Sequence, residues 1–198
     1  KTMIKAKDMQ VFEILNELDE IKTDAEKIQL LRQKYADHTP LHRILQMNFA
    51  DNIKSILPEG EPPFNKEEED GPSKANLWSY LRQLPVFVVS TQSQKMRMLQ
   101  IERIFIEMLE AIGREEAEMF CLAKDKRLQT KWSISLEVTQ QAFPGLKIVS
   151  SAPPVEKTEE QRAEEMIALA EMKKKQAKEL QTEARNLLNE AKKIAAEV

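Results

Sequence analysis

Hydrophobic residues recur every three or four positions along most of this chain, which is the spacing of one face of an α-helix. The pattern predicts helices over residues 8–20, 23–35, 39–57, 76–84, 94–112, 115–123 and 133–143. Thr23-Asp-Ala-Glu26 matches a capping box, and Pro40 suits the first position of a helix. Gly113 is expected to end the helix 94–112 as a left-handed cap. We therefore expect an all-α protein.

The helical pattern is interrupted where prolines, glycines and acidic residues gather. Residues 58–75 contain the acidic run Glu67–Asp70 and predict a long surface loop. Val86–Val89 is the only plausible strand, but it has no obvious partner and is expected to pack as an extended segment. Ser150–Pro154 predicts a linker. These breaks predict a compact multi-helix domain over 1–150, a linker over 151–157 and a separate helix over 158–198.

The predicted core consists of large apolar residues on the inward faces of these helices. Its members are Phe12, Leu15, Leu31, Leu45, Ile101, Phe105, Leu109, Leu122 and Phe143.

The last segment differs from the rest because neither glycine nor proline occurs after Pro154. Apolar residues spaced alternately by three and four form a heptad seam, with alanine at one position and larger aliphatic residues at the other. The seam residues are Ala177, Leu180, Ala184, Leu187, Ala191 and Ile194. About 40 residues at ~1.5 Å each give a rod of roughly 60 Å. We expect this seam to bind a partner helix, from a second copy or another protein; the alternative is a lone solvated helix held by Glu–Lys pairs.

Composition narrows the function classes. The formal net charge of −3 provides no overall basic field for nucleic acid or an anionic membrane, and no apolar run is long enough to span a bilayer. The single cysteine, Cys121, fits a reducing compartment, so the expected location is the cytoplasm.

No residue pattern favours catalysis, a cofactor, a metal or a small-molecule substrate. His38 and His42 have i, i+4 spacing but no third ligand near them in sequence, so we interpret them as surface or capping residues. Cys121 lies on an apolar helix face, and no two glycines are close enough for a phosphate loop. The chain is therefore expected not to be an enzyme.

A basic turn is the strongest local signal for binding. Lys124, Lys126, Arg127 and Lys131 lead into Trp132 and a helix start at Ser133 or Ser135. Free N–H groups at a helix start, with nearby basic side chains, can hold a DNA phosphate, and the tryptophan can stack. The alternative is a solvated basic turn with Trp132 in the core.

Five short segments in order carry a resemblance over roughly residues 9–148. They are Val11-Phe-Glu-Ile-Leu-Asn-Glu-Leu18, Leu57-Pro-Glu-Gly-Glu-Pro-Pro63, Ile106-Glu-Met-Leu-Glu-Ala-Ile112, Ala123-Lys-Asp-Lys-Arg-Leu128 and Ala142-Phe-Pro-Gly-Leu146. The chain resembles uncharacterised small helical proteins of T-even-like phages, many from marine hosts. More distantly it is similar to the N-terminal DNA-binding domain of the ATP-dependent DNA ligases of these phages. The resemblance implies a ligase-like helical domain and a location in the host cytoplasm, with incorporation into the virion as a second possibility.

The chain departs from the ligases at positions that matter for activity. It has no Lys-x-Asp-Gly adenylation motif, the turn Lys131-Trp-Ser-Ile-Ser135 has no glycine, and Gln140 stands where an asparagine is common. Two hypotheses follow. The first is a non-catalytic phage protein that binds DNA as an accessory module. The second is a virion or assembly component whose domain and C-terminal helix dock onto other phage proteins.

Overall fold

A computed structural model describes residues 9–65, 75–146, 148–149 and 159–196, and it is all-α. The α-helices are α1 (Val11–Asp19), α2 (Asp24–Lys34), α3 (Thr39–Phe49), α4 (Leu77–Tyr80), α5 (Met98–Ala111), α6 (Arg114–Lys124), α7 (Leu136–Ala142) and α8 (Glu159–Ala196). Short 3-10 turns are η2 (Leu84–Phe87), η3 (Ser93–Lys95), η4 (Leu128–Thr130) and η5 (Pro144–Leu146). Within the described residues, no helix is both long and apolar enough to cross a membrane.

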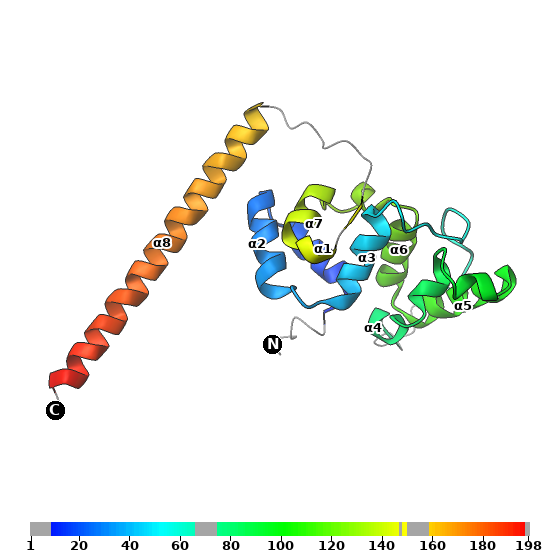
Figure 1. Ribbon diagram of the computed structural model, residues 1–198, viewed down its shortest axis with the longest axis horizontal. Helices are drawn as coiled ribbons and strands as arrows, with labels where there is room; N and C mark the ends of the chain where they lie inside the picture. The colour runs from blue at the N-terminus through cyan, green and yellow to red at the C-terminus, as the bar shows by residue number, and fades with distance from the viewer. Residues whose placement is uncertain (1–8, 66–74, 147, 150–158, 197–198) are drawn as a thin grey trace. The chain divides into compact units, whose positions relative to one another are not determined.

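Contacts divide the chain into two compact units. The larger comprises residues 1–22 and 27–154, and the smaller comprises residues 23–26 and 155–198. In the larger unit α3 and α6 pack against each other most extensively, with α1, α5 and η4 also in contact with α6 (Figure 1). In the smaller unit, α8 is a 38-residue helix.

The core of the larger unit largely matches the predicted one. Leu15, Leu31, Leu45, Ile101, Phe105, Leu109 and Phe143 are buried, whereas Phe12 and Leu122 are partly buried and pack against them. Three rings form its aromatic centre: Phe105 lies 5.4 Å from Phe87 and 5.9 Å from Phe120, measured between ring centroids. Burial of the whole set of core side chains, including these rings, supplies the main hydrophobic stabilisation of the domain.

The third predicted helix is shorter than its apolar pattern indicated. It ends at Phe49, and Ala50 is already extended. The following residues pair with the segment after η2, because the Ile56 N–H donates to the Phe87 carbonyl at 3.1 Å and the Val89 N–H donates to the Lys54 carbonyl at 2.8 Å. Long-range pairing has here overridden the local helical periodicity.

Two further expectations about local structure were wrong. Val86 and Phe87 belong to the 3-10 turn η2 instead of an extended segment, although Val88 forms an isolated antiparallel bridge with Ser55. Gly113 has φ −60°, so it is no left-handed cap; it is the N-cap of α6. The acidic run Glu67–Asp70 and the linker 151–157 lie outside the described residues.

Candidate functional site

The basic turn begins where α6 ends, in a motif that normally uses glycine. The Arg127 N–H donates to the Leu122 carbonyl at 2.8 Å and the Lys126 N–H to the Ala123 carbonyl at 3.1 Å, which is the bond pair of a Schellman cap. Lys126 has φ 60°, in the left-handed region that costs a residue with a Cβ roughly 1–2 kcal/mol. The turn therefore carries a lysine at a position where glycine would be less strained.

The contacts of the Lys126 side chain explain why a lysine occupies this position. Its Nζ donates to the carbonyl of Ala50 at 2.5 Å and, at 3.4 Å, to that of Met47, so it caps the C-terminus of α3. A cation at that end is also favoured by the helix dipole. Burial lowers the pKa of Lys126 despite the nearby Asp51 carboxylate. This ammonium group holds two helices together and does not face solvent freely.

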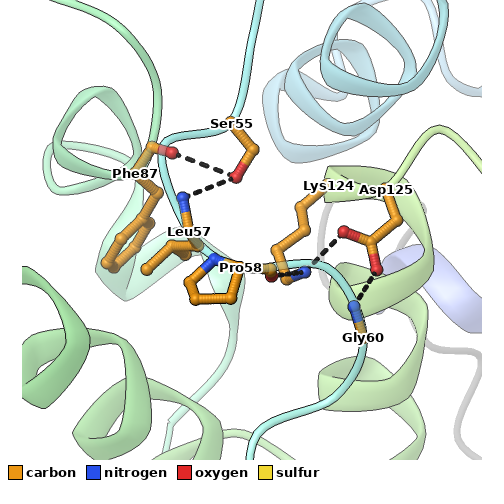
Figure 2. Close-up of polar contacts among 7 residues, drawn as sticks. All are labelled: Ser55, Leu57, Pro58, Gly60, Phe87, Lys124 and Asp125. Carbon is orange, nitrogen blue, oxygen red and sulfur yellow. Dashed lines mark hydrogen bonds and ion pairs between the residues drawn. The ribbon is translucent and has the colours of Figure 1, made fainter.

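Lys124 is also used inside the protein, as Figure 2 shows. It is only 4% exposed, and its Nζ donates to the Pro58 carbonyl at 2.7 Å and to the Asp125 carboxylate at 2.5 Å. The other oxygen of Asp125 accepts the Gly60 N–H at 2.8 Å. Because a buried charge must be paired and hydrogen-bonded, this lysine anchors the loop after Leu57 to α6.

Two of the four basic residues remain exposed. Arg127 and Lys131 both reach solvent, but the Nζ of Lys131 lies 2.7 Å from the Glu118 carboxylate and 4.9 Å from the centre of the Trp132 ring. The positive charge open to a phosphate is therefore about half of what the sequence suggested.

Trp132 occupies the core instead of the surface. It is 3% exposed, and its Nε1 donates to the Asn16 side-chain oxygen at 2.7 Å. A ring held in this way cannot stack on a base without unfolding the contact. The alternative that places Trp132 in the core is the one the structure shows.

The backbone that was expected to hold a phosphate already has partners. The Ser133 N–H and its hydroxyl both donate to the Asp19 carboxylate at 2.6 Å, and the Val138 N–H donates to the Ser135 hydroxyl at 3.1 Å as an N-cap. The Asp19 carboxylate stands where an anion would bind, and it would repel a phosphate.

The histidines have structural roles. His38 is buried and is the N-cap of α3: its Nδ1 accepts the Leu41 N–H at 3.2 Å, and its Nε2 contacts the Met9 carbonyl at 3.0 Å. The His42 ring packs 4.5 Å from that of Phe143. Burial lowers the pKa of both imidazoles. In the part of the chain that the structure describes, no three His, Cys, Asp or Glu side chains are placed to hold a metal ion.

Glu116 is a buried carboxyl group whose pKa is shifted well above its ordinary value. It is buried, and its carboxylate accepts the Leu77 N–H at 3.2 Å. Burial raises the pKa of Glu116 to about 7, against the opposing effect of hydrogen bonds from the backbone of Leu77 and Val11. These hydrogen bonds tie α1 and α4 to α6.

The seam of α8 is open to solvent where its side chains are described. Leu180 is 65% exposed, and Ala177 and Ala184 are exposed as well. The side chains of Leu187, Ala191 and Ile194 lie outside the described residues. Met166 and Ile167, nearer the start of α8, are also largely exposed.

A second exposed surface was missed by the sequence reasoning. Between Asp70 and Glu102 the sequence contains no acidic residue, although the chain has 33. The exposed side chains from this stretch include the apolar Val89, Met98 and Leu99 and the basic Lys95 and Arg97. They lie within residues 89–99, whose loop 90–96 is held compact by the Ser90 and Ser93 hydroxyls. The acid-free run was visible in the sequence, but the exposure of its apolar residues was not.

The described residues form an all-α protein that exposes apolar side chains on α5 and α8. The chain belongs to a family of unknown function, DUF6433, which it matches over residues 14–130. The match runs from within α1 to the end of η4, so it includes Lys124, Lys126 and Arg127 but not Lys131, α7 or α8. No curated protein matches the chain.

Proposed function

We propose that this chain is a non-catalytic phage interaction protein that docks onto other proteins, as a virion or assembly component. The phage context rests on the sequence resemblance. The observation that carries the docking function is the exposed apolar seam of α8, since a soluble helix gains nothing from displaying Leu180 at 65% exposure.

The surface on the larger unit supports the same function. Leu99 is 77% exposed at the start of α5 beside the exposed Met98, and Val89 is exposed before the loop 90–96. Aliphatic side chains flanked by Lys95 and Arg97 suit an acidic, partly apolar protein surface. Single-stranded nucleic acid would instead be expected to stack on exposed aromatic rings.

The test is the composition of purified particles. Mature virions of the phage that encodes the chain should contain it, and Leu180→Asp should reduce its incorporation severalfold. Thr182→Asp is the matched control, because Thr182 is also exposed on α8 but lies off the seam. Absence of the parent protein from both virions and assembly intermediates would refute this function.

DNA binding is the second candidate, and the exposed Arg127 and Lys131 favour it together with the ligase resemblance. Each neutralised phosphate contributes about −0.9 to the log–log slope of affinity against salt on duplex DNA. Arg127→Ala with Lys131→Ala should therefore flatten the slope by about 2 if these residues make the contacts. Unchanged binding by the double variant would exclude the basic turn as the site, and no binding by the parent would exclude the function.

A further inference from the structure

Small and large side chains alternate along the seam of α8 more regularly than an ordinary amphipathic helix requires. Every seventh residue is alanine over five consecutive heptads: Ala163, Ala170, Ala177, Ala184 and Ala191. The other seam position is occupied by larger residues: Met166, Lys173, Leu180, Leu187 and Ile194. The described members of both rows are exposed.

This pattern does not suit parallel pairing with a second copy. In a parallel pair, like positions face each other, so each alanine layer would bring together two methyl groups and leave the seam poorly filled. The two copies of Lys173 would also meet in one layer, which places like charges in the interface. The sequence therefore disfavours the parallel arrangement at every alanine layer and at Lys173.

In an antiparallel pair, each alanine position faces a larger residue of the other copy. One register brings Ala177 opposite Leu180, Ala184 opposite Lys173 and Ala170 opposite Leu187, and it overlaps the two helices along their whole length. Every layer then joins one small and one large side chain, which is how facing positions interdigitate without voids. Each Lys173 can lay its methylene chain over an alanine and keep its ammonium group at the edge of the interface.

The charges that flank this register are compatible. The residues beside the seam place Lys174 opposite Gln181 and Gln176 opposite Glu183, so neither pair repels. The ammonium of Lys173, which faces Ala184 of the second copy, lies near the neighbouring Glu183 of that copy. This opposite-charge contact occurs twice by symmetry.

We propose that α8 pairs with α8 of a second copy of this chain in an antiparallel, close-packed coiled coil with Ala177 opposite Leu180. This inference rests on the proposed docking function and names the occupant of the seam. The protein is then a dimer with its two helical domains attached to opposite ends of the paired helices.

Disulfide trapping tests both the pairing and its direction. Two full-length chains of different tag mass, one with Lys173→Cys and one with Ala184→Cys, are mixed in a Cys121→Ala background under a glutathione redox buffer. Facing positions allow a disulfide, whereas two copies of residue 184 would be separated by 11 residues, or roughly 16 Å along the helices, too far for a bridge. The mixed disulfide should exceed either homodisulfide at least tenfold.

Predominance of the Ala184→Cys homodisulfide would overturn the antiparallel direction. Sedimentation equilibrium provides the second readout: the parent chain should have twice its single-chain mass, Leu180→Asp should be a monomer, and Thr182→Asp should remain a dimer. A monomeric parent would overturn self-pairing. If the parent is monomeric but enters virions in a way that depends on Leu180, the seam binds another protein and the docking function stands. If the monomeric parent is absent from virions, the docking function is refuted as well.

Discussion

The lysines of the basic turn show that residue type alone does not define a binding site. Lys124 and Lys126 are next to Arg127 in sequence, but their ammonium groups bond the carbonyls of Pro58 and Ala50 inside the domain. Neutralising one of these lysines removes a structural contact, while neutralising Arg127 removes only surface charge. Stability measurements therefore separate basic side chains that hold the fold together from basic side chains that are only exposed.

Lys124→Ala should lower the free energy of unfolding by about 3 kcal/mol or more, because it leaves the Asp125 carboxylate and the Pro58 carbonyl without their cation. Arg127→Ala should change it by less than about 0.5 kcal/mol. Urea denaturation of the two variants and the parent measures both effects. Equal, small changes would mean that the Lys124 contacts do not hold the loop.

Glu116 gives the domain a specific dependence on pH. Its pKa is raised from 4.5 to about 7 in the folded protein, so the folded state binds a proton more tightly than the unfolded chain. The stabilising contribution of this group is therefore complete below pH 4.5 and is lost as the pH rises through 7. The loss amounts to as much as about 3 kcal/mol.

Glu116→Gln removes this titration but keeps a side-chain oxygen for the Leu77 N–H. As the pH rises from 4.5 to 8, the parent should lose up to about 3 kcal/mol of unfolding free energy relative to the variant. Subtracting the two curves cancels the opposing effect of His38 and His42, whose lowered pKa values make the fold more stable as the pH rises. Parallel curves for the two proteins would contradict the buried-carboxylate account.

At the scale of elements, α5 has one face in the core and exposes the apolar residues Met98 and Leu99 at its start. Phe105 contacts the rings of Phe87 and Phe120, whereas Leu99 is 77% exposed on the same helix. Phe105→Ala should cost about 3–5 kcal/mol of stability and Leu99→Ala less than about 0.5. Thermal unfolding of both variants checks the assignment, which fails if the two melting temperatures shift by similar amounts.

The helices and most of the core could be predicted from the sequence because their apolar spacing is a local property. The end of α3 could not, since residues after Ala50 leave the helix to pair with the segment following Phe87. The left-handed cap was placed at Gly113 by residue type, but Lys126 adopts it because its side chain also caps α3. Such contacts join residues about 30 to 80 positions apart, and periodicity contains no information about them.

The binding residues were harder to predict for the same reason. The four basic residues are close together in sequence, but which of them face solvent depends on α3, the loop after Leu57 and Glu118. The exposure of Leu99 and Val89 depends in the same way on how η2 and η3 pack. By contrast, the size pattern along α8 is fully contained in the sequence.

At the scale of the whole molecule, a helical domain is followed along the chain by a long helix with an apolar seam. The domain supplies a second surface around Lys95, Arg97 and Leu99, which suits an acidic partner. Its exposed basic charge at Arg127 and Lys131 is small beside the acidic residues of the chain. We therefore propose that the protein acts mainly through contacts with other proteins and not with nucleic acid.

Site-specific photo-crosslinking in the cell that naturally makes the protein tests this claim most directly. A benzophenone amino acid replaces Leu180 on the seam in one strain and Thr182 off the seam in another, and the crosslinked products are resolved by mass. The account predicts a discrete protein adduct, to a second copy or to another phage protein, from position 180 and little or none from position 182. No adduct from position 180, or the same adducts from both positions, would contradict it.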